Sequence, residues 1–231
     1  MSDDGLRRAA ETAIGQCMDL KPGESCAVVT DDERRPIGEA LYAVASETTE
    51  DAVFLQYPPG DQHGAEPPEP VAAAMRAADV FVAPTTKSLS HTQARSAATD
   101  DGARGATMPG ITEEVMIRGL DADYGAIGEA CADLLAQVEG AEEIHVTSPQ
   151  GTDVVFEPGD RAWRDDVGLN HDPGDFSNLP AGEVFVSPVD ANGTYVVDGT
   201  MMPHGRIDPD QRLEFEVQDG YVTSISDGAI R

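Results

Sequence analysis

Cys26-Ala27-Val28-Val29-Thr30 is a short, continuous run of mostly apolar residues, and Asp79-Val80-Phe81-Val82-Ala83-Pro84 is a second one. A strand that is buried on both faces has this pattern, because helices cover both sides of a parallel sheet. Ala52–Tyr57 and the shorter Gly105–Met108 are the other expected strands. The sequence therefore predicts a central parallel sheet.

Helical patterns separate these strands. Leu6–Leu20 carries apolar residues at helical spacing and ends at Pro22-Gly23. The other expected helices are residues 36–46, residues 70–77, one that ends near Ala98, one that begins at Thr112, and residues 123–138. Strands that alternate with helices pair in parallel through right-handed crossovers. We therefore expect residues 1–140 to form an α/β domain, Rossmann-like and with three layers.

A different pattern follows Gly140. Ile144–Thr147 and Asp153–Phe156 alternate in polarity and are joined by a short turn, which predicts a hairpin. Asp219-Gly220 is a strong turn signal between two later strands. The further expected strands are Glu183–Ser187, Thr194–Val197, Leu213–Val217 and Tyr221–Ile225. Residues 141–231 are therefore expected to form a mostly antiparallel β segment.

The charge balance is strongly acidic. The 231 residues include 43 Asp and Glu against 15 Lys and Arg, so the formal net charge is −28 at pH 7. Phosphate backbones and anionic membranes would be repelled, so we expect binding to neither. The acidic residues are spread along the chain, and the lysines are Lys21 and Lys87. This pattern resembles haloarchaeal proteins and favours adaptation to concentrated salt, which screens the repulsion.

The cysteines and the hydropathy of the chain indicate in which cellular compartment the protein is expected. Cys17, Cys26 and Cys131 are odd in number and have no CxxC spacing, so we expect buried thiols rather than disulfides or a zinc site. The first residues contain no apolar leader, and no run of about 18 apolar residues occurs. We therefore expect a cytoplasmic protein.

Two polar stretches follow expected strands of the parallel sheet, where open α/β sheets bind ligands. The first spans residues 84–114 and gathers scarce cations and hydroxyl groups. Its possible cleft residues are His91, Arg104 and Glu113. The alternative is that its hydroxyl groups only cap helices.

The second stretch is Gly174–Phe185. A Pro180-Ala181-Gly182 turn places Glu183 at the start of a strand with apolar neighbours. A carboxylate in that position either faces solvent or points into a cleft as a metal ligand. Asp175, at the end of a loop rich in carboxylates, is a further possible cleft residue.

Several strings together resemble the aminopeptidase T family of metallo-aminopeptidases, in family order. They are Ser88-Leu89-Ser90-His91-Thr92, Ala106–Glu114, Gly151-Thr152-Asp153, Asn178–Phe185 and Ala191-Asn192-Gly193-Thr194. The resemblance implies an exopeptidase that removes N-terminal residues from peptides with two divalent ions of zinc, cobalt or manganese. It also implies that Glu183 is a metal ligand. His91 and Arg104 match family strings for which no catalytic role is carried over.

The chain also departs from this family. The family's other ligands lie beyond the strand that matches Tyr221–Ile225, and no string here resembles that half. Glu183 alone does not hold a metal pair, because catalytic sites use three or more protein ligands. The resemblance therefore implies a piece of a longer hydrolase or a shortened relative without peptidase activity.

Two other functions follow as alternatives. A scaffold that has lost its metal site would serve as a non-catalytic binding module. The 2,5-dihydroxypyridine dioxygenases resemble the same family and use iron, so an iron-dependent oxygenase is the third hypothesis. We also expect a homodimer, since an apolar surface exposed where the missing half packs would promote association.

Overall fold

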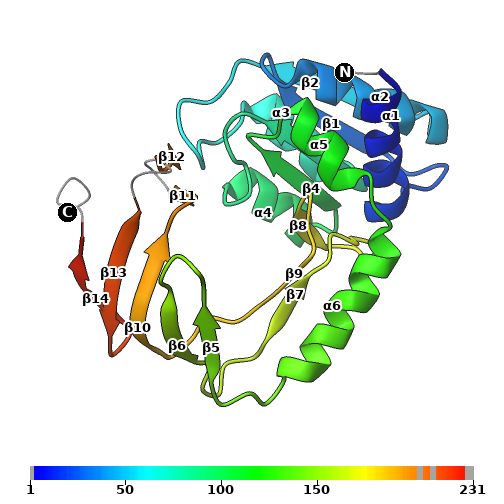
Figure 1. The fold of residues 1–231 in the computed structure, drawn as a ribbon. Helices are drawn as coiled ribbons and strands as arrows, with labels where there is room; N and C mark the ends of the chain where they lie inside the picture. The colour runs from blue at the N-terminus through cyan, green and yellow to red at the C-terminus, as the bar shows by residue number, and fades with distance from the viewer. Residues whose placement is uncertain (1–2, 202–204, 209–211, 227–231) are drawn as a thin grey trace. The chain divides into compact units, whose positions relative to one another are not determined.

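The computed structural model describes residues 3–201, 205–208 and 212–226 of the chain. The chain divides into two compact units (Figure 1). The first contains Met1–Asp133 and Asp165–Glu183, and the second contains Leu134–Arg164 and Val184–Arg231. This division differs from the expected single boundary near residue 140, because residues 165–183 return to the first unit.

The first unit is built on a parallel sheet with the strand order β2-β1-β3-β4-β8. Its strands are β1 (Cys26–Asp31), β2 (Ala52–Tyr57), β3 (Val80–Thr85), β4 (Arg104–Pro109) and β8 (Phe176–Asn178). The four strands expected from the sequence are confirmed. The fifth, β8, was not predicted, and it pairs with β4 so that Thr107 lies opposite Asn178.

Helices cover this sheet. They are α1 (Asp3–Glu11), the π-helix η1 (Thr12–Cys17), α2 (Arg35–Thr48), α3 (Glu69–Ala77), α4 (Gln93–Asp100) and α5 (Glu113–Leu120). A further helix, α6 (Tyr124–Val138), begins in this unit, where Tyr124 belongs to the core, and ends in the second unit. The single helix expected over residues 6–20 is therefore an α-helix that continues as a π-helix. The other expected helices are confirmed to within a few residues.

Two hydrophobic cores lie on the two faces of the sheet. Neighbouring residues of a strand point to opposite faces, so Val28 contributes to one core and Val29 to the other. Leu41 of α2 and Met116 of α5 belong to the first core, and Met75 of α3 belongs to the second. The predicted three-layer α/β class is therefore confirmed.

The second unit contains an antiparallel sheet with the order β14-β13-β10-β6-β5. Its strands are β5 (Ile144–Thr147), β6 (Asp153–Glu157), β10 (Asp190–Val197), β13 (Leu213–Gln218) and β14 (Tyr221–Ile225). One face of this sheet is apolar and partly exposed, with Tyr195 and Val222 at its surface. Two small sheets pair β7 (Arg164–Asp166) with β9 (Glu183–Phe185), and β11 (Thr200–Met201) with β12 (Gly205–Arg206).

Two further expectations concern the thiols and the membrane. Cys17, Cys26 and Cys131 are free and buried, as predicted. Burial raises the pKa of both Cys17 and Cys26 to about 12. Among the helices of the described residues, none combines the length and the apolar character needed to span a bilayer.

Gly105 provides a test of the packing between β4 and β3. A Cβ at this position would lie 2.5 Å from a ring carbon of Phe81. Gly105→Ala should therefore lower the free energy of unfolding by about 1–3 kcal/mol, the usual cost of overpacking a core. Gly15→Ala is the control, because nothing lies within 4 Å of a Cβ there. Chemical denaturation in concentrated salt measures both, and equal stabilities of the two variants would contradict the packing.

Candidate functional site

Three polar segments from the carboxyl edge of the parallel sheet meet in one hydrogen-bonded cluster. Ser90 follows β3, Thr107 lies within β4, and Asn178 ends β8. The Ser90 Oγ and Thr107 Oγ1 atoms are 2.7 Å apart, and they lie 2.9 Å and 2.7 Å from Oδ1 of Asn178. Ser90 and Thr107 are buried, whereas Asn178 is exposed. The Ser90–Thr107–Asn178 cluster joins three strings that the sequence analysis had singled out separately.

Neighbouring bonds hold the cluster in place. Ser88 Oγ donates to Ser90 Oγ at 2.9 Å, and the backbone N–H of Ser88 donates to Nδ1 of His63 at 3.1 Å. Arg95 donates to the carbonyl of Ser90 at 2.8 Å and lies 4.5 Å from the centre of the Phe176 ring. The loop after β3 is thus attached to α4 and to β8, which limits the positions that Ser90 can take.

A pair of carboxylates lies next to this cluster. Asp166 is half-buried, and burial is the main cause that raises the pKa of its carboxyl. The charge of Glu183 raises this pKa further. Two backbone N–H groups lower it: that of Gly168, which donates to Oδ1 of Asp166 at 3.2 Å, and that of Asn178. Asp166 therefore interacts with both Asn178 and Glu183. We call these two carboxylates the Asp166–Glu183 pair.

The turn before Glu183 is held by close packing. A Cβ on Gly119 of α5 would lie 2.4 Å from Cγ of Pro180, so only glycine leaves room for the proline ring. The N–H of Ala181 donates to the hydroxyl of Tyr124 at 3.3 Å. Gly182 has φ of 139°, a conformation that favours glycine. These contacts place Glu183 at the first residue of β9.

The structure brings only some of the other predicted cleft residues to the carboxyl edge. His91 is exposed in the loop between β3 and α4, and Glu113 is the first residue of α5. Thr112 caps α5 by accepting from the N–H of Val115, as the capping alternative predicted. Their loops follow β3 and β4, as expected for cleft residues.

Arg104 and Asp175 lie at the opposite, amino edge of the sheet, where β4 and β8 begin. This position differs from the expected one. The carboxylate of Asp175 accepts from the N–H groups of His171 and Asp172 at 3.1 Å and 2.9 Å. Its carbonyl accepts from the N–H of Gly105 at 2.9 Å. Asp175 thus closes the loop that leads into β8.

The guanidinium of Arg104 is buried and makes four hydrogen bonds. It donates to the carbonyls of Met18 and Asp19 at 2.9 Å and 3.1 Å. Two further bonds of 2.8 Å and 2.7 Å reach the carboxylate of Glu24. Arg104 therefore binds the end of η1 to the start of β4. No local sequence pattern indicated this role, because the partners of Arg104 lie about 80 residues away in the chain.

The donor set does not complete a metal centre. Within the described ranges, no three His, Cys, Asp or Glu side chains are grouped closely enough to hold a metal ion. The Asp166–Glu183 pair supplies two carboxylates, whereas catalytic metal sites use three or more protein ligands. These residues therefore do not fit a complete metal site by themselves.

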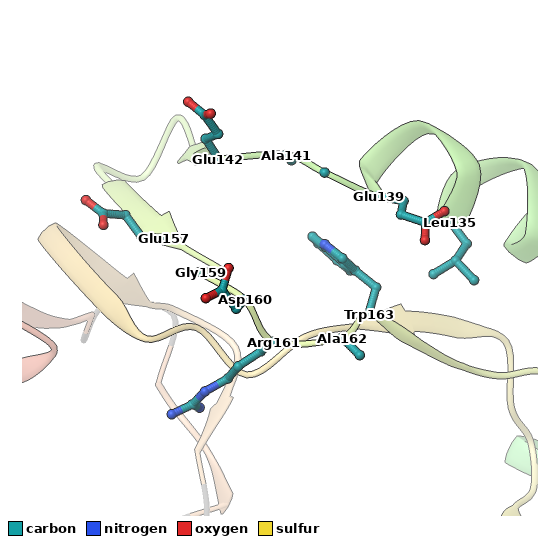
Figure 2. Close-up of a pocket in the computed structure, with 11 residues that line it drawn as sticks. Leu135, Glu139, Ala141, Glu142, Glu157, Gly159, Asp160, Arg161, Ala162 and Trp163 are labelled. Atoms are coloured by element: carbon teal, nitrogen blue, oxygen red, sulfur yellow. The ribbon is translucent and has the colours of Figure 1, made fainter.

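The second unit contains a hollow that the sequence did not indicate. It has a volume of about 540 Å³ and lies between the end of α6 and the segment after β6. Figure 2 shows the indole of Trp163 projecting into it, with Leu135 and Glu139 at one side and Asp160 at the other. A single tryptophan in a charged loop carries no sequence signal, so only the fold reveals this hollow.

The fold and the sheet edge define an α/β protein whose parallel sheet has a polar carboxyl edge that carries carboxylates. A family model for 2,5-dihydroxypyridine 5,6-dioxygenase matches residues 6–230, so the chain belongs to that family. No curated protein matches the sequence.

Two solved structures share the fold. The structure of 2,5-dihydroxypyridine dioxygenase from Pseudomonas putida KT2440 is 21% identical with a TM-score of 0.75. The match covers 99% of this chain and 69% of that one. The aminopeptidase T structure from Thermus thermophilus is 18% identical with a TM-score of 0.62, covering 97% of this chain and 72% of that one. At these identities the likeness shows the fold alone.

The Arg104–Glu24 ion pair should make stability depend on pH. The hydrogen bond from Arg104 is the main cause that lowers the pKa of Glu24. The stabilisation is therefore present above the ordinary carboxyl range and is lost as the pH falls through the lowered pKa. Glu24→Gln should cost about 1–3 kcal/mol at pH 7, because a buried guanidinium loses its charged partner.

Denaturation curves at neutral and acidic pH measure this effect. The control is Glu114→Gln, which breaks an exposed pair with Arg118 and should cost less than about 1 kcal/mol. A cost for Glu24→Gln that stays constant down to strongly acidic pH would contradict the assignment.

The Asp166–Glu183 pair should lower stability in the absence of a ligand. Asp166→Asn removes a half-buried charge that faces Glu183, so its melting temperature at neutral pH should exceed that of the wild type. Asp165→Asn is the comparison, because Asp165 is exposed and its charge is the smallest of the causes that shift the pKa of Asp166, so the melting temperature should rise less. Calorimetry in one salt buffer compares the three proteins. A lower melting temperature for Asp166→Asn would mean that hydrogen bonds outweigh the repulsion.

Proposed function

We propose that this protein takes part in oxygenase chemistry on a hydroxylated pyridine-type ring, and that the Asp166–Glu183 pair helps to bind iron. The family match over residues 6–230 is the observation that carries this proposal. The dioxygenase-like fold, which extends over 99% of the chain, supports the same choice. A metal is implied by both structural relatives, and iron is the choice that follows from the dioxygenase family.

The proposal requires ligands beyond the described residues, because two carboxylates do not complete an iron site. The chain itself contributes the fold and a carboxyl sheet edge on which the polar side chains are already positioned. The half-buried position of Asp166 beside Glu183 keeps two acceptors close together at a cost in stability, which is a common feature of functional sites. The Ser90–Thr107–Asn178 cluster keeps the end of β8 beside this pair.

A metallo-aminopeptidase, the main hypothesis from the sequence strings, is now the second candidate. The sequence strings favour it, with zinc, cobalt or manganese and a peptide substrate. The family model instead describes the dioxygenase, and the likeness to aminopeptidase T extends only to the fold at 18% identity. The oxygenase, first given as an alternative, is therefore the better-supported candidate.

Metal binding by the wild type and Glu183→Gln tests the role of the carboxylate pair. Each protein is equilibrated with iron(II) without oxygen in concentrated potassium chloride, and bound metal is measured by mass spectrometry. Glu183→Gln should weaken iron binding about tenfold or more, because an amide is a poorer ligand than a carboxylate. Asp165→Asn makes the same charge change one residue from Asp166 and should weaken iron binding much less, because its charge acts on Asp166 less strongly than that of Glu183 and it is not a proposed ligand.

Oxygen uptake with 2,5-dihydroxypyridine and leucine release from leucine amide separate the two enzyme classes. The proposal predicts uptake with iron and no release of leucine. Leucine release with zinc, cobalt or manganese would favour the peptidase instead. Equal iron binding by the wild type and Glu183→Gln would exclude the pair as ligands. A chain that binds no metal and turns over neither substrate would be a binding module on the family scaffold.

A further inference from the structure

The hydroxyl protons of the cluster determine which way the Asn178 amide faces. Ser88 Oγ donates its proton to Ser90 Oγ, so the Ser90 proton needs another acceptor. With Oδ1 of Asn178 facing inward, that oxygen accepts from both Ser90 and Thr107. With the amide reversed, Ser90 and Thr107 would share only each other, and one buried hydroxyl proton would lack an acceptor. An unsatisfied buried hydroxyl lowers stability, so the inward oxygen is favoured.

The consequence is an oriented donor at the surface of the sheet edge. Asn178 is exposed although its oxygen is bound to two buried groups. Among the residues that the structure describes, none accepts a hydrogen bond from its Nδ2. A side chain held on its inner side and free on its outer side is pre-organised to bind a ligand atom, because its rotamer entropy is already lost.

The position of this donor places it at the candidate site. The backbone N–H of Asn178 interacts with the Asp166 carboxylate, which in turn interacts with Glu183. The edge around Asn178 thus carries acceptors, and the amide supplies a neutral donor among them. Carboxylates cannot donate hydrogen bonds. A ligand bound to them through a metal ion or through its own hydroxyl proton therefore needs another group to donate a hydrogen bond to its oxygen atoms.

We infer that the Nδ2 amide of Asn178 binds an oxygen substituent of the ring-type ligand, a hydroxyl or a ring carbonyl, and so selects hydroxylated rings. This inference rests on the proposed function. A site built to hydrogen-bond one oxygen discriminates strongly against ligands without it, because a bound ligand that covers the amide and lacks the oxygen leaves the amide unpaired. Asn178 acts here as a specificity residue, and the Ser90 and Thr107 hydroxyls position it.

Asn178→Asp is the informative variant. An aspartate oxygen can still accept from Ser90 and Thr107, while the outward donor is replaced by an acceptor. Asn178→Ala removes both functions, and because Ser90 and Thr107 can then donate only to each other, one buried hydroxyl proton is left without an acceptor. The first variant should therefore keep the fold and lose the donor, whereas the second should also melt at a lower temperature.

Binding of three probes separates the donor from a general charge effect. The probes are 2,5-dihydroxypyridine, 2-hydroxypyridine and 3-hydroxypyridine, titrated by difference absorbance with iron(II) present and oxygen excluded. The wild type should prefer 2,5-dihydroxypyridine over one of the single-hydroxyl probes by about tenfold or more. Asn178→Asp should lose that preference, because the missing oxygen no longer has a donor to bind.

The remaining outcomes each overturn a stated idea. Unchanged probe preference in a folded Asn178→Asp variant overturns the role of Asn178 and leaves the proposed function intact. An equal weakening for all three probes assigns the effect to added charge and also overturns the inference. Absence of binding of every probe to the wild type overturns this inference together with the proposed ring substrate.

Discussion

Buried hydroxyl groups must find acceptors, and this requirement holds the carboxyl edge of the parallel sheet together. Ser90 and Thr107 are buried, so an unpaired hydroxyl on either of them would be costly. Both find their acceptor in Asn178, which ends a strand of three residues. Through that contact, residues 165–183 pack with the first unit. The turn that leads to Glu183 therefore starts from the fixed position of Asn178.

The two edges of the sheet use polar contacts for different purposes. At the amino edge, Arg104 donates to carbonyls just after η1 and to the carboxylate of Glu24, and Asp175 closes the loop into β8. These groups are satisfied and leave little to offer a ligand. At the carboxyl edge, Asn178 keeps an outward donor and Asp166 faces a second carboxylate. A functional edge retains unfulfilled polar groups, which lowers stability and makes binding possible.

The family match and the side chains at the carboxyl edge of the sheet are consistent with the same proposed function. A dioxygenase-type scaffold accounts for the fold over residues 6–230. In the proposed function, the carboxylate pair would supply part of a metal site, and the outward amide would recognise an oxygenated ring. The described residues would then contribute arrangement and selection.

The sequence by itself determined the layered α/β class and the antiparallel segment, because apolar periodicity is a local property that strands and helices display directly. It also singled out the strings that contain Ser90, Thr107 and Asn178. Only the tertiary structure decided that these three residues touch, that Arg104 faces the amino edge, and that Asp166 is the neighbour of Glu183. Those relations depend on pairing between residues far apart in the chain, and a strand as short as Phe176–Asn178 has too few residues to show a pattern before it pairs.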